Sequence, residues 1–247
     1  MRDSATRPRN KCAFEARNMR RNGAKGVKMN LIFDFDSTIV GTETLDELVK
    51  SKLETSEQQA EIDAITLAAM DGRLDFHASI TRRFAVANLT AEDFKCIARN
   101  ITGKITPGFV ELICARQERR DEIFIVSGGF IDTIMPIASI LGIPRENCFA
   151  NDCEEVPSGL CLVEGPLLYD GGKNIVVRAL KVAGRLPGRT VMIGDGMSDF
   201  GVFASGDADD FIGFGAHVVR PRVLENAPNF AMTAEELAAL LDNLSAL

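Results

Sequence analysis

The chain has 247 residues, of which 46% are hydrophobic and 26% are charged, a composition typical of one large or two modest globular domains. No stretch approaches the roughly 18 uninterrupted apolar residues of a membrane-spanning helix, which argues against an integral membrane protein. Only two histidines occur, His77 and His217, which argues against a histidine-rich metal site and against serine–histidine catalysis. Any catalytic chemistry is therefore expected from the 35 acidic residues.

Charge is distributed unevenly along the chain. Residues 1–30 hold nine Lys or Arg and two Asp or Glu, although the whole chain has a net charge of −7. The acidic remainder argues against a nucleic-acid partner, and an anionic substrate would need locally placed cations or a metal. Residues 1–29 lack an apolar signal-peptide core, and we interpret them as a basic, disordered leader. We expect a cytoplasmic monomer or homodimer without a membrane partner; organellar targeting by the leader is the alternative.

From residue 30 onward, short apolar runs alternate with helical patterns. Each run is rich in β-branched or aromatic residues and stops at Gly or Asp, which predicts buried strands. The predicted strands span residues 30–36, 122–127, 191–194 and 211–214. Helices are expected over 131–141, 173–182 and 233–244. This alternation predicts an α/β fold with a doubly wound, mostly parallel sheet of the Rossmann-like type.

Residues 44–100 contain no convincing strand. Capping boxes at Thr44 with Glu47 and at Ser56 with Gln59 predict helix starts. An insertion directly after the first strand would lie over the ligand crevice at the carboxyl ends of the strands. We therefore expect a small helical cap domain over 43–100, inserted into an α/β core formed by 30–42 and 101–247.

The first predicted strand ends in two acids, Asp34 and Asp36. If the strand continues through them, its alternation places both on one side. Two nearby carboxylates repel each other and burial increases that repulsion, which a divalent cation such as Mg²⁺ relieves. A calcium loop is excluded because Ile39 and Leu45 stand where such a loop needs Gly and Glu. A solvated acidic turn is the alternative.

Another pair of acids, Asp195 and Asp199, follows the strand at 191–194. Glycines on both sides of Asp195 would let the backbone pass close to a ligand. The Gly-x-Gly pattern here is not a dinucleotide fingerprint, because it lacks the third glycine. A carboxylate at this sheet edge would complete a metal site with those of the first strand.

Two further segments could bind an anion. Ser127, Gly128 and Gly129 are predicted to close a strand and open a helix, whose N-terminal amides and the hydroxyl favour an anion; a plain strand-to-helix turn is the alternative. Lys173 is expected in the first turn of a helix, where it opposes the helix dipole. Contact with a bound anion would explain its position, and a solvated lysine is the alternative.

The order of these segments resembles the four motifs of the haloacid dehalogenase superfamily of aspartate-nucleophile phosphatases. The matching positions are the D-x-D-x-T box at 34–38, Ser127, Lys173 and the Gly-Asp-Gly-x-x-Asp box at 194–199. Over nearly all of 30–242 the chain resembles the phosphoserine phosphatase family. The stretches that carry this resemblance are DFDSTIVGTETLDEL, MDGRLDFHASITRR, ITPGFVEL, VSGGF, CFAN, GGK, MIGDGMSD and FIGFGAHVVRPRV.

The resemblance implies Mg²⁺-dependent hydrolysis of O-phospho-L-serine to L-serine and phosphate. Asp34 would attack the phosphorus and form an aspartyl phosphate, and Asp36 would protonate the leaving oxygen and then activate water. The implied ligands of Mg²⁺ are Asp34, the backbone carbonyl of Asp36, and Asp195, with Asp199 in support. The implied contacts to the phosphoryl group come from Ser127, Gly128, Gly129, Lys173 and Ser198.

The resemblance also implies how the substrate is selected. Glu43 would bind its ammonium group and Arg83 its carboxylate, with Met70 and Phe76 lining the pocket. Arg82 is adjacent to Arg83 in the sequence, and either of the two could be the one on the surface.

The chain departs from the family pattern at Asp152, where Arg is usual, and mildly at Ser198, where Asn or Thr is usual. These departures leave open a related phosphatase or phosphotransferase for another small metabolite, such as phosphohomoserine or a methylthio-sugar-derived phosphate. A receiver-like signalling module is a further alternative, although such modules are about half as long and have no helical cap. A protein that only binds is disfavoured because every catalytic position is filled.

Overall fold

The computed structural model describes residues 27–71, 73–157 and 159–246. Nearly all of the expected leader lies outside these ranges, and the first strand begins at Met29, one residue before the predicted start. None of the helices in the described ranges has the length and apolar character needed to cross a membrane.

A seven-stranded sheet forms the centre of the molecule, in the order β4-β3-β2-β1-β5-β6-β7. Neighbouring strands are parallel except β3 and β4, which pair antiparallel. This confirms the predicted α/β fold with a doubly wound, mostly parallel sheet. The strands are β1 (Met29–Phe33), β2 (Glu122–Phe130), β3 (Cys148–Val156), β4 (Gly159–Val163), β5 (Arg189–Gly194), β6 (Asp210–Phe214) and β7 (Asn229–Ala231).

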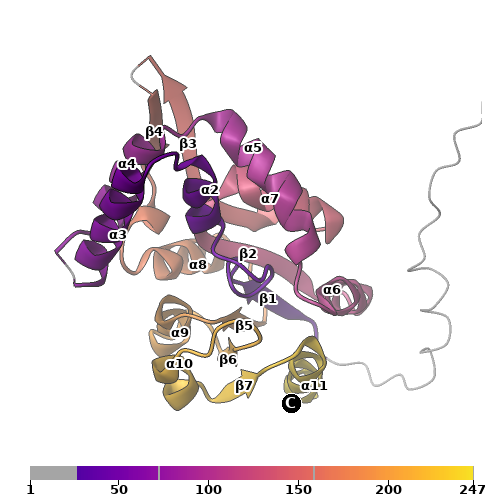
Figure 1. Ribbon diagram of the computed structural model, residues 1–247. Helices are drawn as coiled ribbons and strands as arrows, with labels where there is room; N and C mark the ends of the chain where they lie inside the picture. Colours follow the sequence, from indigo (N-terminus) through magenta and orange to yellow (C-terminus); the bar gives the residue numbers. More distant parts are fainter. Residues whose placement is uncertain (1–26, 72, 158, 247) are drawn as a thin grey trace, which may run out of the picture.

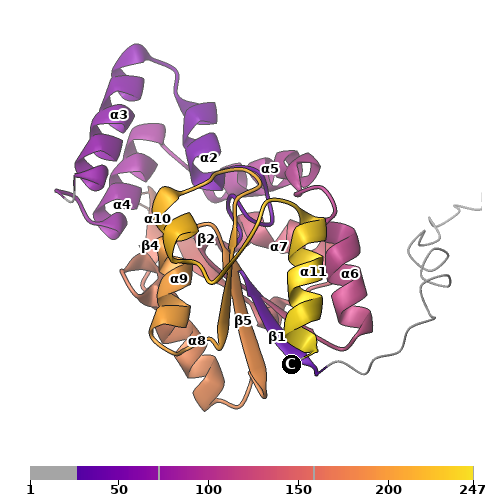
Figure 2. The same cartoon turned by 90° about the horizontal axis from the view of Figure 1, so that it is seen from below.

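Helices cover both faces of the sheet (Figure 2). One face carries α6 (Phe109–Glu118), α7 (Ile131–Ile140) and α11 (Ala234–Ser245). The other carries α8 (Gly172–Val182), α9 (Met197–Ala204) and α10 (Pro221–Asn226). Short 3₁₀ helices are η1 (Ile101–Lys104), η2 (Arg145–Asn147) and η3 (Pro166–Leu168).

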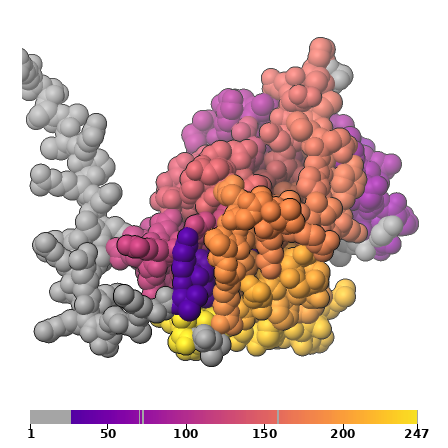
Figure 3. All heavy atoms as spheres, turned by 180° about the vertical axis from the view of Figure 1, so that it is seen from behind, coloured from indigo at the N-terminus to yellow at the C-terminus, as the bar shows by residue number. Residues whose placement is uncertain are grey.

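The central strand β1 is buried along its whole length. Because successive side chains of a strand point to opposite faces, Leu31 and Phe33 enter the core beneath α6, α7 and α11, whereas Ile32 enters the core beneath α8 and α9. β2 and β5 pair with β1 on its two sides. Figure 3 shows indigo residues at the surface, with magenta residues on one side and orange residues on the other. The apolar run that predicted this strand is therefore explained by burial on both faces.

Between β1 and β2 the chain forms α6 and, before it, four helices in residues 44–100, which we call the helical insertion. They are α2 (Thr44–Lys52), α3 (Ser56–Met70), α4 (Phe76–Ala87) and α5 (Ala91–Asn100). The insertion has no strand in its described residues, 44–71 and 73–100, and Figure 1 shows it on the side of the sheet away from β6 and β7. The Phe84 and Phe94 rings pack on Phe130 of β2, with ring centroids 5.4 and 5.0 Å away. The insertion thus shares a hydrophobic core with the sheet.

Neither predicted capping box of the insertion forms where it was expected. Thr44 is the first residue of α2 rather than its cap, and its N–H donates to the Asp36 carboxylate over 3.1 Å. In α3 the box is formed by Thr55 and Gln58, one residue earlier than predicted. The Asp36 contact matters because it joins an acidic residue of the first motif to the insertion.

Candidate active site

A cavity of about 570 Å³ lies where β1, β2 and β5 end, next to the helical insertion. It brings together residues that are far apart in the sequence, and most of the predicted site residues line it. Asp199 is fully buried behind the wall, and the side chain of Met70 lies outside the described part of the structure. The predicted residues that line the cavity are Asp34, Asp36, Glu43, Phe76, Arg83, Ser127, Gly128, Gly129, Lys173, Asp195 and Ser198.

Asp34 is the first residue after β1. Its N–H donates to the carbonyl of Ile193 over 2.9 Å, so pairing with β5 continues up to the point where the side chain leaves the sheet. Its Oδ1 accepts the N–H of Phe35 at 2.8 Å and lies 2.8 Å from Nζ of Lys173. Asp34 is only 9% exposed, and the cavity is the space that its carboxylate faces.

Asp36 does not share a strand with Asp34, because β1 ends at Phe33. Asp36 lies instead in a tight turn, where it forms an isolated bridge with Val40. Burial, together with the charges of Glu43 and Asp34, raises the pKa of Asp36 to about 8. A carboxyl group that keeps its proton near neutral pH can donate that proton to a departing oxygen.

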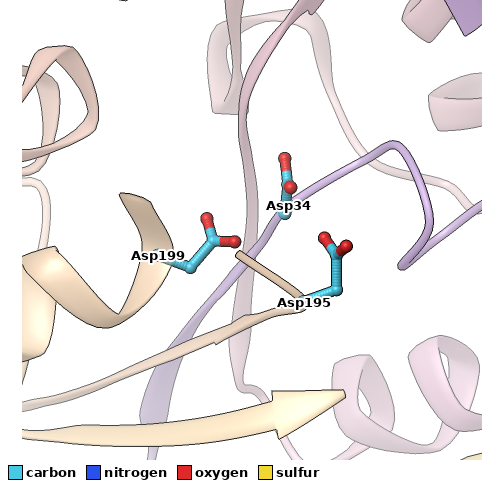
Figure 4. Close-up of side chains that lie close together, drawn as sticks. All are labelled: Asp34, Asp195 and Asp199. Atoms are coloured by element: carbon cyan, nitrogen blue, oxygen red, sulfur yellow. The ribbon is translucent and has the colours of Figure 1, made fainter. Parts of the chain in front are cut away.

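Three carboxylates converge at the end of β5. Asp34, Asp195 and Asp199 each have an oxygen within 4.8 Å of the others, and they come from three separate elements (Figure 4). Burial, and next the charge of Asp34, raises the pKa of both Asp195 and Asp199. A cation bound among them would relieve this repulsion, and the all-oxygen set fits Mg²⁺. The Asp36 side chain is not part of this group.

Lys173 is buried, with 8% exposure, so the alternative of a solvated lysine is wrong. Its Nζ lies 2.8 Å from Oδ1 of Asp34 and 2.5 Å from Oδ1 of Asp199. Burial disfavours the charged form, but the carboxylates of Asp199 and Asp34 outweigh it and raise the pKa of Lys173. The lysine can stay protonated and offer a positive charge to an anion in the cavity.

The start of α8 holds Lys173 in place through close packing. A Cβ atom on Gly172 would lie 2.1 Å from the carbonyl oxygen of Pro166 in η3. Only glycine fits at this point, which explains the second glycine of the GGK sequence.

The prediction that Ser127, Gly128 and Gly129 open a helix is wrong. Strand β2 continues to Phe130, with an irregular register after Val126, and α7 begins at Ile131. The Gly129 N–H donates to Oγ of Ser127 over 2.9 Å. A bulged strand end, rather than a helix N-terminus, therefore lines the cavity here, and the Gly129 N–H is already used within it.

Arg83 lines the cavity from α4 of the helical insertion. Its Nη1 donates to Oδ1 of Asp46 over 2.8 Å and its Nη2 donates to Oγ1 of Thr66 over 2.9 Å. Its Nε is buried and has no hydrogen-bond acceptor among the described residues. Arg82 is exposed, so the structure selects Arg83 of the two.

Arg220 also lines the cavity, and the sequence analysis assigned it no role. Its Nε donates to Oδ2 of Asp195 over 2.8 Å and its Nη2 to Oε1 of Glu43 over 3.3 Å. Glu43 also accepts the hydroxyl of Ser37 at 2.9 Å, and burial raises the pKa of Glu43. The only available signal was that Arg220 lies in the FIGFGAHVVRPRV stretch.

The two residues that depart from the family pattern lie in different parts of the structure. Ser198 lines the cavity, whereas Asp152 lies on the exposed part of β3, where its Oδ1 accepts the N–H of Cys153 at 2.9 Å. Asp152 is not a lining residue, so its exchange leaves the site unchanged.

Comparison with known proteins agrees with this geometry. The family model described as haloacid dehalogenase-like hydrolase matches residues 31–204. The phosphoserine phosphatases of Bos taurus and Homo sapiens are both 34% identical over 213 residues, covering 85% of this chain and 92% of theirs. The chloroplastic phosphoserine phosphatase of Arabidopsis thaliana is 32% identical and covers 85% of this chain and 70% of its own.

Solved structures give the same result. A phosphoserine phosphohydrolase-like protein from Francisella tularensis superposes with a TM-score of 0.73 at 32% identity, covering 87% of this chain and 100% of its own. A substrate-bound phosphoserine phosphatase complex superposes with a TM-score of 0.68 at 29% identity, covering 88% and 98%. The chain therefore belongs to the haloacid dehalogenase-like hydrolases and, within them, to the phosphoserine phosphatase family.

Proposed function

We propose that the protein is a Mg²⁺-dependent phosphatase that hydrolyses O-phospho-L-serine to L-serine and phosphate. The observation that carries this proposal is the set of side chains that line one cavity. Asp34 lies against Lys173, and an acidic and a basic side chain, Glu43 and Arg83, line the same cavity. A phosphorylated amino acid has the matching groups: a phosphate, an ammonium and a carboxylate.

Asp34 is the nucleophile of this proposal. Its Oδ1 is already engaged by Phe35 and Lys173, so we assign the attack to Oδ2. A new Oδ2–P bond forms as the bond between phosphorus and the serine oxygen breaks, leaving an aspartyl phosphate. Forming a covalent intermediate divides one difficult hydrolysis into two easier steps.

Asp36 moves the proton in both steps. As a neutral acid it gives its proton to the departing serine oxygen, and as the resulting carboxylate it takes a proton from the water that attacks the aspartyl phosphate. The second step releases inorganic phosphate and restores both carboxyl groups. The Thr44 N–H holds Oδ1 of Asp36 in place throughout.

Lys173 supplies a fixed positive charge to the phosphoryl oxygens, and the Ser127 hydroxyl with the Gly128 amide supplies hydrogen bonds, while the Gly129 N–H holds Oγ of Ser127 in place. Asp34, Asp195 and Asp199, with the backbone carbonyl of Asp36, would hold Mg²⁺. When bound, the ion neutralises charge on the transferring phosphoryl group. The surrounding residues orient that group toward Asp34.

Selection for the serine part rests on Glu43 and Arg83. Glu43 offers a carboxylate to the substrate ammonium, and Arg220 and Ser37 fix its orientation. The unsatisfied Nε of Arg83 is a buried donor that a substrate carboxylate would satisfy. Together they would distinguish an amino acid phosphate from a sugar phosphate.

The direct test is a panel of phosphomonoesters assayed with and without Mg²⁺. We expect kcat/KM for O-phospho-L-serine to exceed that for phosphothreonine, phosphohomoserine and sugar phosphates, and activity to be lost with EDTA and restored by Mg²⁺. Equal rates across the panel would contradict the substrate assignment while leaving the phosphatase chemistry intact.

Replacing Arg83→Ala should raise KM for phosphoserine by about 10- to 100-fold, the range expected for losing a charged hydrogen-bonding group. The rate with p-nitrophenyl phosphate, which has no carboxylate, should stay near that of the unmodified protein. Steady-state kinetics with both substrates measures this difference.

Arg82→Ala is the matched control, because Arg82 is adjacent and exposed. We expect it to change neither substrate's KM. An equal loss on both substrates in Arg83→Ala, or an effect of Arg82→Ala of similar size, would contradict the assigned role.

Asp36→Asn should lower kcat for phosphoserine by about 10²- to 10⁴-fold, because the amide cannot transfer a proton in either step. p-Nitrophenolate is a good leaving group that departs without a proton, so the first step should survive with that substrate. Stopped-flow measurement should show a burst of p-nitrophenol followed by slow turnover. A linear trace without a burst would argue against separate steps.

We propose a cytoplasmic location. Cys96, Cys148, Cys153 and Cys161 are free thiols, which suits a reducing compartment. Fractionation of cells that express the full chain would test this, and recovery in an organelle would favour targeting by the leader.

A further inference from the structure

His217 connects two loops that meet beside the cavity without lining it. It lies on the loop after β6, and its Nε2 is 2.8 Å from Oγ1 of Thr106. The Thr106 hydroxyl in turn donates its single proton to the carbonyl of Thr38 over 2.6 Å. Nε2 of His217 must therefore carry a proton and donate it to Thr106.

The His217 ring also packs directly against Gly41. A Cβ atom on Gly41 would lie 2.7 Å from Cε1 of the ring and 2.8 Å from Nδ1. Gly41 does not have a positive φ, so the glycine is required here by space rather than by backbone conformation. The ring and the glycine thus form a close, matched contact between the loop after β6 and the turn after β1.

Both residues of this contact lie close in sequence to a residue of the Glu43–Arg220 pair. Gly41 precedes it by two residues in the turn after β1, and its N–H is fixed by the carbonyl of Lys104 at 2.8 Å. Arg220, three residues after His217, donates from Nη2 to Oε1 of Glu43. His217 therefore fixes the distance between the loop after β6, which carries Arg220, and the turn after β1, which carries Glu43. That distance sets the position of the Glu43 carboxylate.

We infer that His217 is a positioning residue that aligns Arg220 and Glu43 for recognition of the substrate ammonium. The inference rests on the proposed function, because it assigns His217 to the selection of an amino acid phosphate rather than to phosphoryl transfer. The hydrogen bond from Thr106 to Thr38 does not need His217, so the loop that carries Asp34 and Asp36 keeps its own anchor. Loss of His217 should consequently affect the binding of phosphoserine more strongly than phosphoryl transfer, although Arg220 also donates to Asp195.

The test compares His217→Ala with His217→Gln, whose side-chain amide can still donate to Thr106. We expect His217→Ala to raise KM for phosphoserine about fivefold to tenfold, the scale of one ordinary hydrogen bond. Its kcat with p-nitrophenyl phosphate and its melting temperature should stay close to those of the unmodified protein. His217→Gln should recover most of the lost affinity for phosphoserine.

A double-mutant cycle with Gly41 separates positioning from general damage. Gly41→Ala alone should raise KM for phosphoserine, because its methyl group displaces the ring, but it should add nothing in a His217→Ala background, where the ring is absent. Unchanged phosphoserine kinetics in His217→Ala, an equal loss on both substrates, or additive effects in the double variant would overturn the inference. Failure of the proposed function would look different, since the unmodified protein itself would show no preference for phosphoserine.

Discussion

Asp34→Asn should lower kcat by at least about 10⁴-fold with both phosphoserine and p-nitrophenyl phosphate, a loss on the scale seen when a catalytic nucleophile is removed. The reason is chemical, because a neutral amide does not attack phosphorus. The fold should remain, since the Asn carbonyl oxygen can still accept the N–H of Phe35 and a hydrogen bond from Lys173. Steady-state assays with circular dichroism and thermal melting measure both properties.

The control for this prediction is Asp170→Asn, which changes another carboxylate that lines the cavity. We expect it to retain most of the activity, because Asp170 has no part in the proposed steps. The Asp34→Asn protein should still bind phosphoserine in a calorimeter. If it turns over within tenfold of the unmodified rate, Asp34 is not the nucleophile.

Lys173→Met is the second large effect, and it concerns stability as well as rate. Removing the ammonium leaves the buried Asp34 and Asp199 carboxylates without their countercharge. Breaking a buried ion pair by deleting one partner typically costs about 3–5 kcal/mol of unfolding free energy. Loss of a charge aimed at the phosphoryl group should also reduce kcat by about 10²- to 10³-fold.

Urea unfolding of Lys173→Met, followed by that of Lys173→Met/Asp199→Asn, separates these two effects. Neutralising Asp199 removes one of the unpaired charges, so the double variant should regain stability. Its kcat should remain low, because the cation near Asp34 is still missing. An unchanged unfolding free energy in Lys173→Met would contradict the role of Lys173 as the buried countercharge.

The sequence predicted the strands that carry the motifs because each is an apolar run buried on both faces of the sheet. It did not predict the β3–β4 hairpin, because the second half of β3 contains the exposed residues Asp152, Glu154 and Glu155. Those residues have low β propensity, and only pairing with β4 makes them a strand. The three-residue β7 is too short to give a pattern.

Part of the candidate site could not be predicted from the sequence either. The choice between Arg82 and Arg83 depends on which face α4 turns toward the cavity, and adjacent residues of a helix point in different directions. Arg220 reaches Asp195 and Glu43 only through tertiary folding of the loop after β6. The motif acids were predictable because parallel strands deliver them to one sheet edge.

The most direct measurement traps the phosphorylated enzyme. The protein is mixed with phosphoserine and Mg²⁺, quenched in acid, and treated with borodeuteride, which reduces an acyl phosphate to an alcohol. We predict that peptide mass spectrometry finds a deuterium-labelled homoserine at position 34, absent when substrate is omitted. With p-nitrophenyl phosphate as the donor, the label should be more abundant in Asp36→Asn. Label at a different acid, or none while turnover proceeds, would contradict the account.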